Sequence, residues 1–182
     1  MPFTFSHCQI SGLVEIQPEI FCDKRGYFFE SWSQKDYNAV GIMPSFVQDN
    51  QSCSGKGVLR GLHFQKEHPQ GKLVRVIKGE VYDVAVDLRS ASPTQGKWHG
   101  VYLSGEKQNQ FYIPEGFAHG FVVLSETAVF AYKCTEFYYP EDESGLLWND
   151  SDIDINWPDI GREYILSDKD KKLPSFRELY KK

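Results

Sequence analysis

Short runs of β-branched and aromatic residues, separated by turn-forming residues, constrain the fold of this chain most. From about residue 14 to residue 139 they occupy residues 27–32, 45–50, 58–65, 72–78, 81–88, 98–103, 110–113, 120–124 and 128–138. Such runs predict short strands at the spacing of a sandwich or barrel. No long amphipathic helix separates them, which argues against a parallel α/β sheet. The sequence therefore predicts an all-β fold, a jelly-roll β-barrel with a few short peripheral helices.

Helical signals are few. Ser33 is a suitable N-cap for a short helix over residues 34–40 that stops at Gly41, and the tail over residues 171–182 has room for a further turn or two. The chain has 182 residues and no internal repeat or linker, so we expect one domain over residues 1–182.

Charge and composition exclude several classes of function. Lys and Arg number 20 against 25 Asp and Glu, a net charge of −5, so no global basic field exists to hold a nucleic acid. No apolar run is long enough to span a membrane, and the N-terminus has no signal-peptide pattern. The four cysteines are scattered without a C-x-x-C pair, which is typical of a reducing compartment. We expect a cytoplasmic protein.

Two strands carry polar side chains in apolar surroundings. Alternation over residues 81–88 places Asp83 and Asp87 on one face and four apolar side chains on the other, so these carboxylates either reach solvent or line a polar cavity. In residues 58–65, strict alternation would send Arg60 and His63 to opposite faces. Gly61 between them predicts a bulge that re-aims one of the two. His63 is then either a hydrogen-bonded core residue or part of a site.

A second histidine follows a turn, in the run IPEGFAHGF at residues 113–121. Together with the G-x5-H run that ends at His63, the P-x-G-x2-H run that ends at His119 is similar to halves of the two metal-binding motifs of the cupins. Gln65 stands where the first motif needs another histidine, so we expect no metal. The remaining histidines, His7, His68 and His99, are predicted to be surface residues.

The chemistry left to the chain is that of its side chains, because it contains no G-x-G-x-x-G run, P-loop or nucleophile elbow. A base, an acid and a cation are what proton transfer at a carbon beside a carbonyl requires. The same set also suits simple binding of an anionic ligand.

Six blocks of the sequence, at residues 46–50, 58–65, 71–76, 79–89, 113–121 and 166–170, closely resemble the dTDP-4-dehydrorhamnose 3,5-epimerase family. The resemblance implies a cofactor-free, cupin-like enzyme that converts dTDP-4-keto-6-deoxy-D-glucose to dTDP-4-keto-L-rhamnose by inverting C3 and C5. In this reaction the C4 ketone acidifies both neighbouring carbons.

The resemblance also implies catalytic roles for four residues. His63 matches the general base, and Asp170 matches the carboxylate that orients its imidazole. Tyr132 matches the acid that delivers a proton from the opposite face at C5. Lys72 matches the cation beside the enolate oxygen.

Binding roles are implied in the same way. The matching positions are Arg25, Glu30, Gln48, Asn50, Arg60, His119, Tyr138, Glu143 and Lys169. Of these, Arg25 and Arg60 suit the diphosphate, and Tyr138 matches an aromatic that stacks on thymine, with Phe21 on its other side. In this family the first strands exchange between two subunits. We therefore expect a homodimer in which Arg25 and Glu30 serve the neighbour's pocket.

Several alternatives stay open. Asp83 is expected near His63 as a second carboxylate partner, and otherwise pairs with Arg75 or Lys72. A mono-epimerase that inverts C3 or C5 alone would keep the same fold and base. A non-catalytic nucleotide-sugar-binding module and a metal-dependent cupin are the alternatives from other classes.

Overall fold

The computed structural model describes residues 2–180. Its elements in chain order are β1 (Phe3–His7), β2 (Val14–Pro18), β3 (Phe21–Asp23), β4 (Gly26–Phe28), α1 (Gln34–Ala39), β5 (Gln48–Gly55), β6 (Leu59–Gln65), β7 (Lys72–Lys78), β8 (Glu80–Asp87), β9 (Trp98–Ser104), β10 (Gln110–Ile113), β11 (Phe117–Val123), β12 (Thr127–Cys134), β13 (Glu143–Gly145), η1 (Asp170–Lys172) and α2 (Phe176–Tyr180). Within these residues, no helix is both long and apolar enough to cross a membrane.

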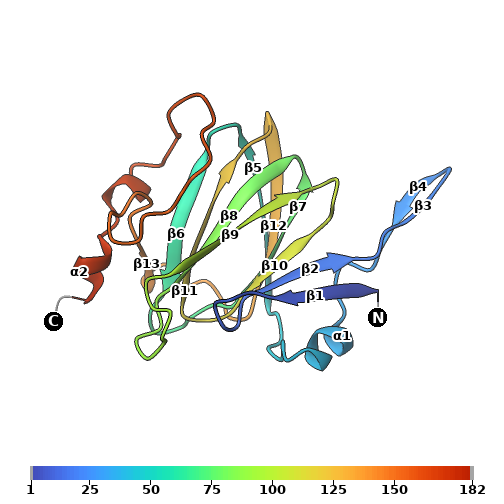
Figure 1. The fold of residues 1–182 in the computed structure, drawn as a ribbon, viewed down its shortest axis with the longest axis horizontal. Helices are drawn as coiled ribbons and strands as arrows, with labels where there is room; N and C mark the ends of the chain where they lie inside the picture. The colour runs from blue at the N-terminus through green and yellow to red at the C-terminus, as the bar shows by residue number, and fades with distance from the viewer. Residues whose placement is uncertain (1, 181–182) are drawn as a thin grey trace.

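Two antiparallel sheets lie face to face (Figure 1). The six-stranded sheet has the order β1-β2-β10-β7-β12-β5, and the five-stranded sheet has the order β13-β6-β11-β8-β9. Strands that are neighbours in a sheet are mostly distant in the sequence, as a jelly roll requires. The predicted all-β fold with few short helices is confirmed.

Apolar side chains hold three layers together. Val74 and Phe130 of the six-stranded sheet pack between the sheets against residues of the five-stranded sheet such as Phe121. The chain after β13 covers the outer face of the five-stranded sheet, where Trp148 and Trp157 pack. This packing leaves the polar residues of the inner faces to line the interior of the barrel.

The helix prediction for residues 34–40 is confirmed to within one residue. Helix α1 begins after Ser33, whose hydroxyl accepts a hydrogen bond from the amide of Asp36, and it packs Tyr37 against the six-stranded sheet. The predicted tail helix is α2, and residues 181–182 lie outside the described residues.

Some predicted strands were wrong in extent. Strand β4 ends at Phe28 rather than at residue 32, and β12 ends at Cys134 rather than at residue 138. Strand β1 was not predicted, because its apolar residues are few and their partners come from β2. His99 was predicted to be a surface residue, but its side chain in β9 is half-buried.

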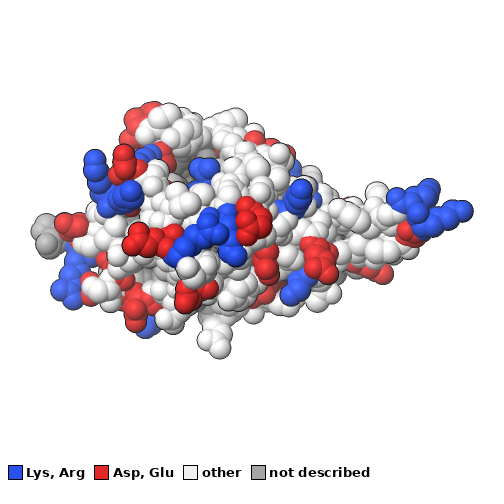
Figure 2. Space-filling model, turned by 90° about the horizontal axis from the view of Figure 1, so that it is seen from above, with Lys and Arg blue, Asp and Glu red and all other residues white. Residues whose placement is uncertain are grey.

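Strands β3 and β4 form a hairpin that projects away from the two sheets (Figure 1). Its aromatic side chains are exposed, with exposed fractions of 51% for Phe21 and 73% for Phe28. Lysine and arginine side chains gather at its tip, where the sequence has Lys24 and Arg25 (Figure 2). We call residues 21–28 the arm.

The predicted irregularity at Gly61 is present. Between the pairs His119–His63 and Phe121–Arg60, strand β6 has one residue more than β11. Gly61 has φ of 117°, and a Cβ there would lie 2.6 Å from the Cα of Gly120. A side chain does not fit at this position. The extra residue brings Arg60 and His63 to the same face of the sheet.

Candidate active site

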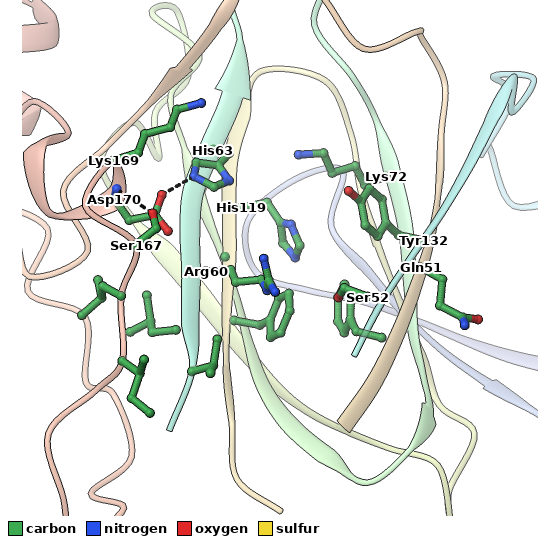
Figure 3. Close-up of a pocket in the computed structure, with 17 residues that line it drawn as sticks. Gln51, Ser52, Arg60, His63, Lys72, His119, Tyr132, Ser167, Lys169 and Asp170 are labelled. Atoms are coloured by element: carbon green, nitrogen blue, oxygen red, sulfur yellow. Dashed lines mark hydrogen bonds and ion pairs between the residues drawn. The ribbon is translucent and has the colours of Figure 1, made fainter. Parts of the chain in front are cut away.

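A cavity of about 490 Å³ lies between the two sheets and is bounded on one side by residues 165–170 (Figure 3). Seven residues predicted from the resemblance line it, namely Arg60, His63, Lys72, His119, Tyr132, Lys169 and Asp170. They come from five different segments of the chain, so the fold itself assembles this set.

His63 and Asp170 form a hydrogen-bonded pair on one wall of the cavity. The His63 Nε2 lies 2.7 Å from the Asp170 Oδ1, and the side chains are 31% and 5% exposed. Burial raises the pKa of Asp170, but hydrogen bonds from His63, Ser167 and the amide of Gly61 outweigh it and hold the pKa below its ordinary value. Because a carboxylate only accepts, Nε2 carries the proton, and Nδ1 of the neutral ring keeps its lone pair.

Two cations face the cavity without a carboxylate partner. Within residues 2–180, neither Lys72 nor Arg60 takes part in an ion pair, although Arg60 Nε donates a 3.1 Å hydrogen bond to Ser54 Oγ. Lys72 is only 8% exposed, and its burial lowers its pKa despite the nearby Asp83 and Glu143. A buried ammonium without a counter-ion is costly, so this site favours a negatively charged or electron-rich ligand.

His119 lies beside His63, because the two residues are directly paired across β11 and β6. Its Nε2 is 2.8 Å from Oδ2 of Asp83, which is fully buried. Asp83 therefore pairs with His119 and not with His63 as expected. Burial raises the pKa of Asp83, although His119 and Lys72 oppose the shift, and its Oδ1 has no hydrogen-bond partner among the described residues.

Tyr132 and Lys72 lie across the cavity from His63 (Figure 3). Both belong to the six-stranded sheet, in β12 and β7, whereas His63 belongs to β6 of the five-stranded sheet. Burial raises the pKa of Tyr132, and nearby Arg60 opposes the shift only in part. The phenol therefore keeps its proton at neutral pH and can donate it.

A second, smaller hollow shares His63, Lys72 and Tyr132 with the cavity and extends it toward Tyr138 and Glu143. Glu143 Oε2 accepts hydrogen bonds of 2.5 Å from the Tyr138 hydroxyl and from Lys169 Nζ. The hydrogen bond to Glu143, together with partial burial and the negative charge of Glu143, raises the pKa of Tyr138 to about 12. The half-exposed Tyr138 ring is thereby held at the rim of the site.

Comparisons with known proteins agree with this geometry. Residues 7–178 match the family model described as dTDP-4-dehydrorhamnose 3,5-epimerase. The dTDP-4-dehydrorhamnose 3,5-epimerase of Methanothermobacter thermautotrophicus is 52% identical over 177 residues, which cover 97% of this chain and 96% of that protein. The chain belongs to the dTDP-4-dehydrorhamnose 3,5-epimerase family. It is therefore an isomerase of the epimerase type, and its fold is of the cupin type.

Solved structures of a 3,5-epimerase and of a 3'-monoepimerase are both similar to this chain. A crystal structure of a 3,5-epimerase from Legionella pneumophila in complex with dTDP-4-keto-L-rhamnose is 51% identical, with a TM-score of 0.94, and the match covers 98% of this chain and 95% of that chain. A 3'-monoepimerase from Streptomyces bikiniensis in complex with dTDP-quinovose is 32% identical, with a TM-score of 0.85 and coverage of 93% and 86%. The epimerase is thus more similar to the first of these than to the second.

Four further predicted binding residues lie outside the cavity. Gln48 and Asn50 lie on β5, where the Gln48 Oε1 accepts a hydrogen bond of 3.0 Å from the amide of Tyr138 and Asn50 bonds to Gln48. Arg25 and Glu30 do not reach the cavity of their own chain. Arg25 lies on the arm of the epimerase, where its guanidinium pairs with Asp23 and is 84% exposed.

Ser167 and Ser54 were not predicted as site residues, although both contact residues that were. Ser167 Oγ accepts a 3.1 Å hydrogen bond from the amide of Asp170, and Ser54 accepts one from Arg60. The alternation of polar residues along β5 was a usable signal for Ser54. Ser167 lies in the block that carries Asp170, and only the turn into η1 brings its hydroxyl to that amide.

The two histidines of the cavity each pair with a separate carboxylate. Among residues 2–180, neither belongs to a group of three metal-ligating side chains whose ligand atoms lie close together. That the epimerase needs no cofactor stays a prediction.

Proposed function

We propose that this chain converts dTDP-4-keto-6-deoxy-D-glucose to dTDP-4-keto-L-rhamnose by inverting C3 and C5. One observation carries the proposal: His63 lies on one sheet with Asp170 of η1 hydrogen-bonded to it, and Tyr132 and Lys72 face it from the other sheet. Inversion at a carbon requires removal of a proton from one face of the sugar and delivery to the other. Groups on two opposed sheets meet that requirement.

His63 begins each inversion by accepting a proton from the carbon beside the C4 ketone at its Nδ1. Asp170 stabilises the imidazolium that results, since its carboxylate is hydrogen-bonded to the other ring nitrogen. Lys72 places a positive charge where the enolate oxygen develops, in a buried site where such a charge acts strongly. Tyr132 then delivers its phenolic proton to C5 from the opposite face, and C3 takes its new proton from water, which reaches the cavity beside the partly exposed His63.

The remaining residues bind the nucleotide. Arg60 suits the diphosphate because its guanidinium can donate paired hydrogen bonds and has no carboxylate partner of its own. The ring of Tyr138, held by Glu143, offers a flat apolar surface at the rim for thymine. His119, Lys169, Gln48 and Asn50 complete the proposed contacts with the nucleotide-sugar.

We further propose a homodimer in which the arm of each subunit enters the neighbour's site. The arm supports this because its aromatic residues are exposed and Arg25 does not line the cavity of its own chain. In the dimer, Arg25 and Glu30 would contact the nucleotide-sugar in the neighbour's site. Each subunit of the proposed dimer consists of a single domain over residues 1–182. A cytoplasmic location also stays a prediction.

A proton-exchange experiment tests the proposed reaction. The protein is incubated with dTDP-4-keto-6-deoxy-D-glucose in heavy water, and the C3 and C5 protons are followed by NMR. Deuterium at both carbons, with rhamnose formed once a 4-keto-reductase is added, is the expected result. Deuterium at one carbon would identify a mono-epimerase, and none at either would refute the proposed chemistry.

Mixing two inactive variants tests the exchanged arm. In a dimer of Arg25→Ala and His63→Ala chains, the site that keeps His63 receives an intact arm from its partner. Random reassociation of a two-fold dimer then restores about a quarter of the wild-type sites. No recovery above the separate variants would show that Arg25 does not act across the interface.

A further inference from the structure

A second group of polar side chains lies outside the active-site cavity, where three strands approach each other. It consists of Cys8 just after β1, Glu15 on β2 and His99 on β9. The Glu15 Oε1 is 2.9 Å from the His99 Nε2 and 3.9 Å from the Cys8 Sγ. The sulfur, nitrogen and oxygen atoms all lie within 4.8 Å of one another.

A thiolate, an imidazole and a carboxylate are a ligand set that zinc binds. Zinc lies about 2.0–2.3 Å from such atoms, so two ligand atoms of a tetrahedral site are about 3.4 Å apart. The observed separations of 2.9 and 3.9 Å lie on either side of this value. Small movements of the side chains are therefore enough to place one ion between them.

The three side chains are held on a rigid framework. The amide of Cys8 donates a 3.0 Å hydrogen bond to the carbonyl of Leu13, and Glu15 is paired on both sides, with β1 and with β10. The ring of His99 packs against Phe111, with 5.8 Å between ring centroids. Because Glu15 is 44% exposed and His99 is 30% exposed, water can reach the group and supply a fourth ligand.

The charge distribution also favours a cation here. The Glu15 carboxylate lies beside both the His99 ring nitrogen and the Cys8 sulfur. A bound divalent ion would be attracted by this carboxylate, and the thiol proton would be released to solvent on binding.

We propose that Cys8, Glu15 and His99 form a structural zinc site with water as the fourth ligand. Glu15 belongs to the six-stranded sheet and His99 to the edge strand of the five-stranded sheet, so the ion joins the two sheets. None of the three residues lines the active-site cavity. The site takes no part in the proposed epimerisation, and a bound zinc ion stabilises the folded chain.

Titration of the purified, metal-free full chain with Co²⁺ and then Zn²⁺ tests the proposal. We expect one ion per chain with a dissociation constant on the order of 1 µM or tighter, a thiolate-to-cobalt charge-transfer band, and displacement of cobalt by zinc. Saturating zinc should raise the melting temperature by about 5–10 °C, as expected for a ligand at 100 times its dissociation constant.

Variants locate the site. Cys8→Ser and His99→Gln should each weaken binding at least about 100-fold and remove the rise in melting temperature, whereas Cys22→Ser on the exposed arm should bind like the wild type. Glu15→Gln replaces Cys8→Ser in this comparison if Cys8→Ser does not fold.

Absence of stoichiometric zinc binding, or zinc binding as tight as that of the wild type in both Cys8→Ser and His99→Gln, would overturn the proposal. The His63→Ala variant should lose epimerase activity but still bind zinc like the wild type. Failure of the zinc proposal can therefore be told apart from failure of the proposed function.

Discussion

Replacement of Asp170 by asparagine should slow turnover far more than it weakens binding or stability. The His63 Nε2 and the Asp170 Oδ1 are 2.7 Å apart, and Asp170 is almost fully buried. The centres of the imidazolium and carboxylate charges are then about 4 Å apart, and at an effective dielectric constant of about 20 their attraction is about 4 kcal/mol. That attraction exists only after His63 has taken a proton, so it stabilises the transition state and not the bound substrate.

The expected loss of kcat in Asp170→Asn is about 10²–10³-fold, because each 1.36 kcal/mol corresponds to a factor of ten in rate. The attraction of about 4 kcal/mol is an upper value, since the partial exposure of His63 to solvent weakens it. The assay couples the epimerase to a 4-keto-reductase and follows NADPH consumption, while calorimetry measures binding of dTDP. Binding should change less than about threefold, since Asp170 acts through His63.

Asp168→Asn is the matched control. Asp168 lies two residues earlier, is 91% exposed and pairs only loosely with Lys171, at 3.7 Å. It should keep wild-type kcat. The proposed role of Asp170 is refuted if Asp170→Asn retains more than about a tenth of wild-type kcat, or if its loss of kcat is matched by an equal loss of dTDP affinity.

Three other substitutions test further contacts. Tyr132→Phe should lower inversion at C5 by about 10²-fold while deuterium exchange from heavy water continues, and loss of exchange together with inversion would contradict a purely acidic role. Lys72→Met should lower kcat by about 10²–10³-fold, and an unchanged kcat would show that the ammonium does not contact the enolate. Burial raises the pKa of Asp87, but hydrogen bonds from Arg89, Ser92 and Thr94 outweigh it and lower the pKa to about 2. The hydrogen bonds to the Asp87 carboxylate therefore stabilise the fold above pH ~4, and this stabilisation is lost as the pH falls toward ~2. In urea unfolding, Asp87→Asn should be less stable than the wild type by about 2 kcal/mol at pH 7 and nearly as stable near pH 2. An equal loss of stability at both pH values would contradict this.

Local patterns predicted those parts of the fold that neighbouring residues decide. Alternation over residues 81–88 placed Asp83 on the opposite face from Val84 and Val86, and the structure has the same arrangement. The glycine between Arg60 and His63 predicted the bulge that turns both side chains toward one cavity. Each of these features depends on only a few consecutive residues.

Contacts between distant strands were harder to predict. Asp83 lies opposite Phe121 and therefore diagonal to His119, and only the register of β8 with β11 decides this. His99 was expected on the surface because nothing near it in the sequence indicates that β2 lies beside it with Glu15. Partners such as these come from strands more than thirty residues away, and no local pattern specifies them.

In the proposed mechanism, His63 removes the protons at both C3 and C5. The most direct measurement follows deuterium incorporation into dTDP-4-keto-6-deoxy-D-glucose in heavy water with His63→Ala, alongside the wild type and the exposed-histidine control His68→Ala. We expect exchange at both carbons in the wild type and the control, and at neither carbon in His63→Ala. Exchange that persists at either carbon in a folded His63→Ala protein would show that another group removes that proton.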